Sequence, residues 1–338
     1  MRTFITITAV FLAAFFITAG SLSAKTYNLT YSIFFPASHD QYKAAEAWAE
    51  AVEEKTDGRV NITMFPGGTL TKAKNCYDGV VDGISDIGMS CFAYTRGKFP
   101  VMEACDLPVG YPDGKTASQA VNKYYEKMKP EELDDVKVLY IHAHGPGLLH
   151  TQKAVKNLED LNKLKIRSTG FSAKVVESLG GIPVAMSQGA TYESLKKGVV
   201  EGTFGPVEVL KGWRQAEVIN YTTDTSNIGY TTTMYVVMNK DKFNRLPDDI
   251  KKIMTDLSRK WVAKHGKAWD ESDKEGVKYS KSLGNEFIKL SEEQKKIWKE
   301  KISPVIDDYV SSAEEKGING RKNVETLRDI IEKSGSAN

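Results

Sequence analysis

An arginine lies near the middle of the chain, where a strand pattern changes to a helix pattern. Leu164 and Ile166 alternate with lysines, which is the period-two spacing of a β-strand. Residues 171–180 then carry apolar side chains at helical spacing, with Ser172 in the position of an N-cap. Arg167 is therefore predicted to lie at the junction between a strand and the start of a helix.

That position suits a guanidinium that binds an anion. It would lie beside unpaired N–H groups of the helix start, in the crevice outside the strand ends where open α/β sheets bind ligands. The planar guanidinium can meet a carboxylate, or two oxygens of a sulfonate, with two parallel hydrogen bonds. The alternative is that Arg167 only pairs with an Asp or Glu at the surface.

Motifs of the common catalytic and nucleotide-binding sites are absent from the sequence. The chain has no GxSxG, HExxH or GxxxxGK[ST] motif, and no GxGxxG opens a helix after a strand. An anion clamp without an evident nucleophile or base indicates binding rather than turnover. The chain is therefore predicted not to be an enzyme.

Composition places the chain among ordinary globular proteins. Its 338 residues suggest about two domains, and 41% hydrophobic with 27% charged residues are usual values. The formal net charge is only +2, without the basic stripe that a phosphate backbone requires. Nucleic acid is therefore not an expected partner.

The N-terminus is predicted to be a secretory signal peptide, residues 1–24. A basic Arg2 precedes an apolar run over residues 4–19, and small residues follow up to Ser23 and Ala24, where cleavage is expected. The run is shorter than a membrane-spanning helix needs. An uncleaved membrane anchor is the alternative, and no later segment is apolar enough to cross a bilayer.

Three cysteines, Cys76, Cys91 and Cys105, are an odd number for an oxidising compartment. One disulfide at most is possible inside the chain, and one thiol is left over. No CxxC motif is present. The interpretation is buried structural thiols, without redox or metal chemistry.

The remaining sequence alternates strand and helix patterns, which is typical of an α/β fold with covered sheet faces. Predicted strands cover residues 27–34, 60–65, 85–89, 136–142, 164–167, 182–185, 202–204 and 234–239. Predicted helices lie between residues 40 and 57 and at 72–81, 116–128, 171–180, 192–197, 247–283 and 324–333, and a capping box at 291–294 begins one more. The pattern over 247–283 is unusually long, and Gly266 and Gly276 are places where it could break or bend.

The order and spacing of these segments resemble the solute-binding proteins of TRAP transporters, the DctP family. The segments that carry the resemblance are Leu164–Arg167, which matches that family's "Leu-Lys-(Ile/Leu)-Arg" strand, Phe99-Pro100 leading to Leu107-Pro108, Tyr192–Leu195 before Gly198–Gly202, and Met234–Lys240. They extend over nearly all of the chain after the signal peptide.

The resemblance implies a periplasmic-binding-protein-like α/β fold with two lobes, a central hinge and a long bracing helix. Lobe 1 would combine residues 25–144 with 234–270, and lobe 2 would combine residues 145–233 with 271–338. The ligand would bridge the lobes, and closure would hide it from water.

The resemblance also implies that Arg167 binds the anionic group of the ligand, while polar and aromatic residues at strand ends shape the pocket. The candidate ligand-binding residues are Arg167, Thr169, Phe35, His39, Phe92, Tyr94, His144, Phe204, Glu208 and Tyr230. Taken singly, each aromatic residue has core packing as its alternative.

A histidine cluster, His142, His144 and His150, is the one group that could indicate a metal. The chain has only five histidines, and no Cys, Asp or Glu completes an obvious ligand set beside them. No metal or cofactor is therefore predicted. His144 is expected to donate a hydrogen bond at the hinge side of the pocket, or else to be structural.

Two departures from the family pattern bear on the ligand. Sialic-acid-type members carry a second arginine where this chain has residues 145–150, and the asparagine that many members place near Gly205 is replaced. A second fixed cation is therefore missing, which favours a ligand with one anionic group. With Ser168 and Thr169 beside Arg167, the hydroxysulfonate isethionate is one hypothesis, and small monocarboxylates, including aromatic ones, are the alternative.

The function that the resemblance implies is capture of a small organic anion in the periplasm by a monomer. The loaded protein would deliver its ligand to two TRAP membrane subunits, a small DctQ-type and a large DctM-type subunit, driven by an ion gradient. Two rival functions are a ligand-sensing protein that docks onto a receptor and a periplasmic enzyme.

Overall fold

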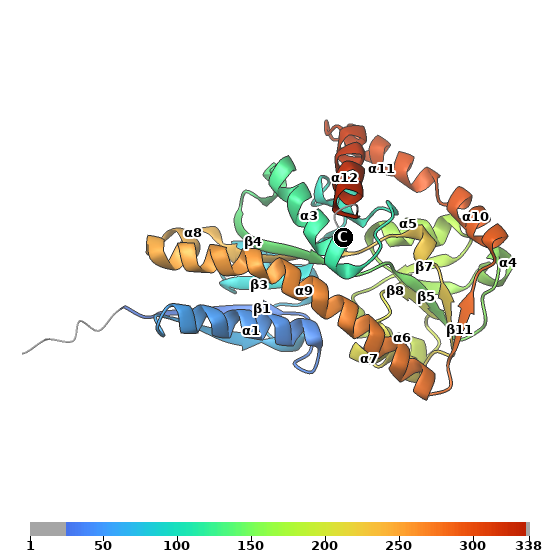
Figure 1. Cartoon of the computed structure of the whole chain (residues 1–338), viewed down its shortest axis with the longest axis horizontal. Helices are drawn as coiled ribbons and strands as arrows, with labels where there is room; N and C mark the ends of the chain where they lie inside the picture. Colours follow the sequence, from blue (N-terminus) through green and yellow to red (C-terminus); the bar gives the residue numbers. More distant parts are fainter. Residues whose placement is uncertain (1–24, 336–338) are drawn as a thin grey trace, which may run out of the picture.

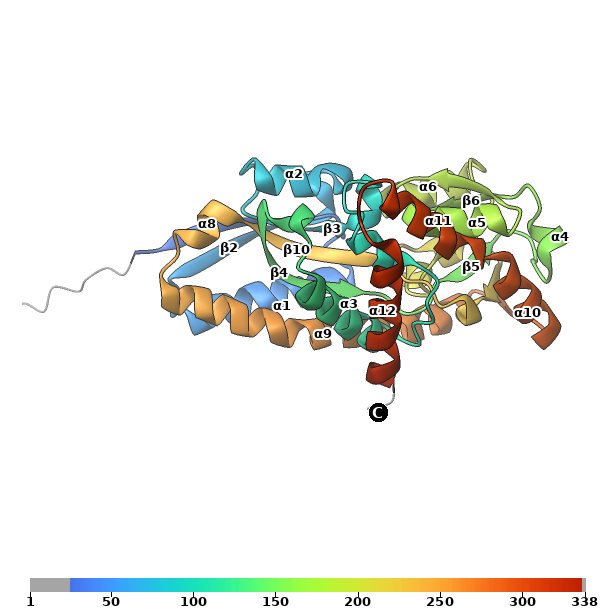
Figure 2. The ribbon, with the colours of Figure 1, turned by 90° about the horizontal axis from the view of Figure 1, so that it is seen from above.

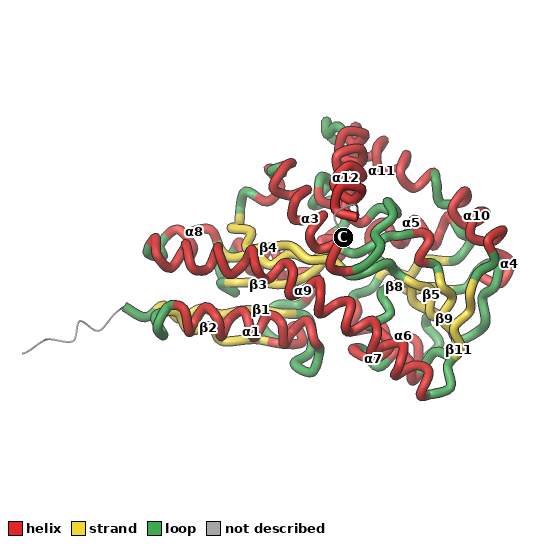
Figure 3. Tube along the Cα trace, in the orientation of Figure 1, coloured by secondary structure: helices red, strands yellow, loops and turns green. Residues whose placement is uncertain are grey.

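The computed structural model describes residues 25–335 of the chain, and its strands form two β-sheets side by side along the longest axis (Figures 1 and 3). The predicted signal peptide, residues 1–24, lies outside the described residues. Within residues 25–335, no helix has both the length and the apolar content needed to cross a membrane.

The first sheet has the strand order β2-β1-β3-β10-β4. Its strands are β1 (Tyr27–Ile33), β2 (Val60–Phe65), β3 (Ile87–Cys91), β4 (Val136–Ala143) and β10 (Thr233–Asn239). β1 pairs in parallel with β2 and β3, whereas β10 is antiparallel to both β3 and β4. The chain therefore returns to this sheet after an excursion of about ninety residues, counted from Ala143 to Thr233.

Helices cover both faces of the first sheet. They are α1 (Asp40–Lys55), α2 (Cys76–Val81), α3 (Gly114–Met128), α8 (Lys240–Asn244) and α9 (Asp248–Ser282). Figure 2 shows α2 on one side of the strands and α1 with α9 on the other. In α1 the spacing of Ala45, Trp48, Ala49 and Val52 turns all four side chains into the core, as the helical period predicts.

The second sheet has the strand order β11-β9-β5-β8-β6-β7. Its strands are β5 (Leu148–Thr151), β6 (Lys165–Ser168), β7 (Ile182–Ala185), β8 (Gly202–Gly205), β9 (Tyr221–Asp224) and β11 (Glu286–Lys289). β6 is parallel to β7 on one side and to β8 on the other. β5, β9 and β11 were not predicted from the sequence.

The helices of this part are mostly short. They are α4 (Leu158–Leu161), α5 (Gly170–Ser178), α6 (Thr191–Lys196), α7 (Val209–Gly212), α10 (Glu292–Lys301), α11 (Pro304–Glu314) and α12 (Gly320–Gly335). α11 packs against α5, while α12 reaches back to α3 beside the first sheet. The lobe boundaries given by the resemblance stay a prediction.

The helix α9 is one continuous element of 35 residues that contacts α1, α3 and β4 at one end and α7 at the other (Figure 1). The expectation that Gly266 or Gly276 breaks it is wrong. A Cβ at Gly266 would lie 2.7 Å from the Cα atom of Lys115, and one at Gly276 would overlap the carbonyl oxygen of Val207. The glycines thus let two other backbone segments approach α9 closely. The predicted α/β class with a long helix is confirmed.

The three cysteines, Cys76, Cys91 and Cys105, are free and buried. Burial raises the pKa of the Cys76 thiol to about 11 and raises the pKa of the other two thiols as well. The thiols therefore stay protonated at neutral pH and pack as small apolar groups.

Candidate ligand-binding site

A narrow cavity lies between the two sheets, at the ends of strands from both. Seven of the ten predicted residues line it: Phe35, Tyr94, His144, Arg167, Thr169, Phe204 and Glu208. The cavity is small: the space open to the centre of a water molecule has a volume of about 30 Å³. These residues are widely separated in the sequence, and they meet here because each lies near the end of a strand. We call the expectation that ligand-binding residues lie at strand ends the strand-end rule.

Arg167 is placed by β6, which ends one residue after it and runs directly into α5. The backbone N–H of Thr169 donates to Ser172 Oγ over 3.0 Å, and the N–H of Ser172 donates back to the Thr169 carbonyl. Thr169 is therefore the N-cap, rather than Ser172 as predicted. Gly170 has a φ of +52°, and even a Cβ there would crowd Ala93 at 3.0 Å.

The guanidinium of Arg167 is buried, with 5% of the residue exposed. Its Nε donates to the carbonyl oxygen of Met186 over 3.0 Å, and none of the ion pairs between described residues involves it. The alternative of a surface ion pair is therefore wrong. A buried cation without a counter-ion is costly, so this arrangement is suited to an anion arriving from outside.

Aromatic rings form the walls of the cavity. Phe34 stacks on Trp213, with 6.2 Å between ring centroids and 12° between planes, and Phe35 lies 5.9 Å from the same indole. Tyr94 meets Phe34 edge-on at 5.6 Å. Trp269, from α9, completes the lining. An apolar slot with one charged end fits a small organic anion.

Direct contacts join the two sides of the cavity. The backbone N–H of Gln188, after β7, donates to the hydroxyl oxygen of Tyr94, after β3, over 3.1 Å. His39, at the start of α1, lies 2.8 Å from Glu208 through its Nε2 atom. These contacts enclose the space around Arg167.

The proton positions on His39 follow from its partners. The backbone N–H of Gln41 donates to Nδ1 over 3.1 Å, so Nδ1 carries no proton. Nε2 therefore carries the proton and donates to the carboxylate of Glu208. Both side chains are almost completely buried, at 1% and 2% exposure. His39 does not line the cavity and instead holds Glu208, which does.

His144 is fully engaged with the backbone. The N–H of Thr232 donates to Nε2 over 2.9 Å, so the proton lies on Nδ1, which donates to the carbonyl oxygen of Gly145. Burial lowers its pKa to about 4, which keeps the ring neutral. The predicted role as a donor to the ligand is therefore wrong for this arrangement, although the ring still lines the cavity.

The other histidines of the predicted cluster have structural partners. His142 stacks on His265 at 4.3 Å and accepts from Trp269 Nε1 over 3.0 Å. His150 contacts the hydroxyl of Thr222 at 2.9 Å. Within residues 25–335, no three His, Cys, Asp or Glu side chains gather as a metal site would require.

Two more predicted residues lie behind the cavity wall. Phe92 packs in the core at 5.0 Å from Phe99 and 5.1 Å from Tyr235. Tyr230 packs against the back of Phe204 at 4.5 Å. Both follow or precede strands, as expected, but their rings point into protein rather than into the cavity. Core packing, the alternative stated for each, describes them.

Three important lining residues were missed: Gln188, Trp213 and Trp269. Gln188 follows β7, the parallel neighbour of the Arg167 strand, so the strand-end rule could have found it. No pattern in the sequence singles out Trp213 or Trp269. The latter comes from the middle of α9, and only the packing of that helix against β4 at one end and α7 at the other brings it here.

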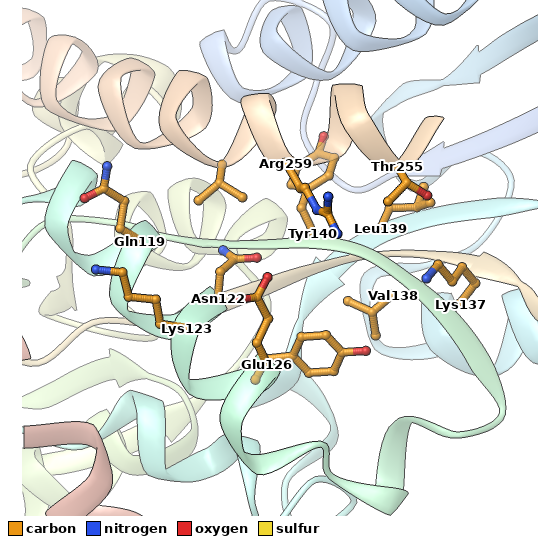
Figure 4. A pocket seen from close by; sticks show the side chains of 12 residues that line it. Gln119, Asn122, Lys123, Glu126, Lys137, Val138, Leu139, Tyr140, Thr255 and Arg259 are labelled. Carbon is orange, nitrogen blue, oxygen red and sulfur yellow. The ribbon is translucent and has the colours of Figure 1, made fainter. Parts of the chain in front are cut away.

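A second, wider groove lies on the surface between α3, β4 and α9, with a volume of about 430 Å³ (Figure 4). Lys123, Lys137 and Arg259 line it together with Glu126 and the partly buried Gln119. It has charges of both signs, and its aromatic lining consists of Tyr125 and Tyr140, so it is a weaker candidate for a ligand site than the cavity at Arg167.

Solved structures similar to this chain belong to TRAP solute-binding proteins. One from Desulfovibrio salexigens, an open complex, is 37% identical with a TM-score of 0.80, covering 91% of this chain and 96% of that one. One from Rhodoferax ferrireducens, in complex with copurified benzoate, is 28% identical with a TM-score of 0.88, covering 92% and 99%. A marine metagenome protein in complex with 3-hydroxybenzoate is 30% identical, also with a TM-score of 0.88 and coverages of 92% and 99%.

The benzoate complex is closer in shape to this chain than the open complex is, although its sequence is less similar. The described chain also has the architecture that the resemblance implied, with two sheets and a long helix. The periplasmic-binding-protein-like fold is thereby confirmed.

Comparison of sequences gives the same result. The C4-dicarboxylate-binding periplasmic protein DctP of Rhodobacter capsulatus is 26% identical over 313 residues, covering 86% of this chain and 90% of that protein. The family described as "Bacterial extracellular solute-binding protein, family 7" matches residues 31–313. This chain therefore belongs to family 7 of the bacterial extracellular solute-binding proteins, the DctP family.

Proposed function

We propose that this protein is the periplasmic solute-binding component of a TRAP transporter and captures a small organic anion. One observation carries the proposal: Arg167 is buried, faces an aromatic cavity and has no carboxylate partner among the described residues. Burying a guanidinium in this way is costly unless an anion completes the site. A bound ligand would supply that anion.

The cavity favours a ligand with one anionic group and a compact body. Among the described residues that line the cavity, Arg167 is the only arginine or lysine. The remaining walls are mainly aromatic. Two structural relatives hold benzoate and 3-hydroxybenzoate, which have this character. We therefore place aromatic monocarboxylates first, with other small monocarboxylates and isethionate as further candidates.

Residues lining the cavity from the two sheets are proposed to separate when the site opens. The proposed lobes are residues 25–144 with 234–270 and residues 145–233 with 271–338. Ligand must bind the closed form better than the open form in order to shift the population. Hydrogen bonds between the two sides, such as Gln188 to Tyr94, support that preference because opening breaks them.

The proposed cellular role follows from the family. The protein would act in the periplasm as a monomer and deliver its ligand to small DctQ-type and large DctM-type membrane subunits, with uptake driven by an ion gradient. We propose no cofactor and no catalytic step. The predicted signal peptide would direct the chain to that compartment.

Thermal unfolding of the purified mature protein tests the proposal. The panel contains benzoate, 3-hydroxybenzoate, phenylacetate, mandelate, lactate, pyruvate, succinate, malate, isethionate and taurine. Native-state binding adds about 2.7 kcal/mol of stability at a hundredfold excess over the dissociation constant, so a true ligand raises the midpoint with concentration. Taurine carries a cationic amine where isethionate carries a hydroxyl, so taurine serves as a control.

Mass spectrometry of the denatured protein accompanies this experiment, because a ligand carried through purification would mask any shift. A released organic acid, or a midpoint raised by one acid of the panel, supports the proposal. Stronger stabilisation by succinate or malate than by any monocarboxylate would contradict the assignment of a single anionic group. The binding function itself would be contradicted if the protein released no acid and no compound of the panel raised the midpoint.

A further inference from the structure

One nitrogen of a carboxamide in the cavity is buried without a hydrogen-bond partner among the described residues. Gln188 is 6% exposed and lines the same cavity as Arg167. Its backbone N–H is used by Tyr94, but its side-chain Nε2 is buried without a hydrogen-bond partner among residues 25–335. A group of this kind costs free energy unless something else satisfies it, because buried polar groups are otherwise almost always paired.

The position of Gln188 relative to the anion clamp is fixed by the backbone. Arg167 Nε donates to the carbonyl of Met186, two residues before Gln188. The segment after β7 thus orients the guanidinium and also carries the carboxamide into the cavity. The rings of Phe34, Phe35 and Trp269 also line the cavity and offer no acceptor for its Nε2.

We propose that Gln188 is a specificity-determining residue that binds a hydroxyl group of the ligand while Arg167 holds the anionic group. This inference rests on the proposed function, since it concerns the ligand of the same site. A hydroxyl both donates and accepts, so it can satisfy either end of a carboxamide. The ligand class is therefore a small hydroxylated organic acid.

The physical basis of selection is the cost of leaving the carboxamide unpaired. An acid that lacks the hydroxyl would fill the cavity but keep Gln188 unsatisfied, whereas the hydroxylated acid would pair it. Sites built to hydrogen-bond a substrate hydroxyl reject the analogue without it for this reason. One hydrogen bond of ordinary strength corresponds to a preference of about tenfold.

The test uses matched pairs of acids that differ by one hydroxyl: ethanesulfonate and isethionate, phenylacetate and mandelate, benzoate and 3-hydroxybenzoate. Dissociation constants are measured by titration calorimetry for the wild-type protein and for Gln188→Met, which keeps the side-chain length without the amide. Gln119→Met, in the groove of Figure 4, is the matched control.

We expect the wild-type protein to prefer the hydroxylated member of at least one pair by about tenfold. Gln188→Met should bring that ratio close to one by weakening the hydroxylated acid alone, and Gln119→Met should leave it unchanged. The unfolding midpoint of each variant without ligand shows whether it is folded. Because methionine removes an unpaired polar group, Gln188→Met should unfold at the wild-type temperature or above it.

Two results would overturn the inference while leaving the proposed function in place. One is equal affinity for both members of every pair. The other is an equal loss of affinity for both members of a pair in Gln188→Met. That result would show that Gln188 binds the anionic group that both acids share, and not the hydroxyl. If the wild-type protein bound none of the six acids, the inference would fail, whereas the thermal panel would still decide the proposed function.

Discussion

The Nε2 atom of His39 donates a hydrogen bond to Glu208 over 2.8 Å, although 169 positions separate the two residues in the sequence. His39 caps the first helix beside the first sheet, and Glu208 follows a strand of the second. The bond therefore links the two sides of the ligand cavity. If the proposed lobes separate on opening, the bond breaks, so we expect it to stabilise the closed form although His39 does not line the cavity.

We expect His39→Asn to weaken ligand binding. Asparagine still caps α1, but it is too short to reach Glu208, so a buried carboxylate loses its donor only in the closed form. A hydrogen bond to a charged group contributes about 1.5–3 kcal/mol, which corresponds to a loss of roughly ten- to a hundredfold in affinity. Calorimetric titration with the ligand from the thermal panel measures the loss.

A second variant blocks the same bond from another position. A Cβ at Gly212 would lie 2.7 Å from His39 Nε2, so Gly212→Ala should weaken binding in the same direction. Small-angle scattering of the ligand-free variants should show a larger radius of gyration than the wild type. Unchanged affinity in both variants would show that the bond does not stabilise the closed form.

Replacing Arg167 should separate binding from stability. Arg167→Ala removes both charge-assisted hydrogen bonds to the anion. Truncating a buried charge contact costs about 2–5 kcal/mol, so affinity should fall by about 30- to 5,000-fold. Without ligand, the variant should unfold at the wild-type temperature or above it, because a buried unpaired cation is removed. Arg167→Lys keeps the charge but not the planar fork, and should bind with intermediate affinity. Wild-type affinity in Arg167→Ala would remove the anion clamp from the site.

The close contact at Gly276 predicts an unusual effect of alanine in a helix. Alanine normally favours a helix over glycine by about 1 kcal/mol. A Cβ at Gly276 would overlap the carbonyl oxygen of Val207, so Gly276→Ala should instead destabilise the protein by about 1–2 kcal/mol and weaken binding as α9 is displaced. Urea unfolding measures the change. Lys278→Ala, on the exposed side of α9, should alter stability by no more than about 0.5 kcal/mol.

Asp106 predicts a dependence of stability on pH. The residue is 3% exposed, its Oδ1 accepts from the backbone N–H of Thr233 over 2.8 Å, and burial raises its pKa to about 7. Since its pKa in the unfolded chain is about 3.9, the folded state holds a proton that the unfolded state has lost between these values. The stabilisation is full below about pH 4 and is lost as pH rises toward 7.

Asp106→Asn isolates this effect from that of the buried histidines, whose lowered pKa values act in the opposite direction. Asparagine can still accept from Thr233 but does not titrate. The free energy of unfolding of the wild type, relative to the variant, should fall by up to about 1.4 kcal/mol per pH unit between pH 4 and 7. Parallel pH profiles for the two proteins would contradict the assignment.

The sequence predicted the parts of the fold that depend on local periodicity. The strand β2 has the predicted bounds Val60–Phe65, and Arg167 lies at the end of its strand as expected. The strands β5 and β9 were missed because neither Leu148–Thr151 nor Tyr221–Asp224 alternates apolar with polar residues, and each is held by partners far away in the chain.

The candidate site was predictable as far as the strand-end rule extends. That rule gave Arg167, Thr169, Tyr94 and Glu208, and applied to β7 it would have given Gln188. It could not show which aromatic rings turn inward. Phe92 and Phe35 both follow strands, yet only Phe35 lines the cavity, because the ring direction is decided by packing between distant segments.

The unbroken helix α9 is one of three passages of the chain between the sheets, the others being the segments from β4 to β5 and from β9 to β10. A single connection would let the two parts of the chain rotate freely relative to each other. Three separate connections restrict their relative rotation. In the proposed open state, the two lobes would then sample only a narrow set of orientations. Closing on a ligand would therefore cost the two lobes little rotational entropy. A larger share of the favourable free energy of the contacts with the anion would then contribute to the binding affinity.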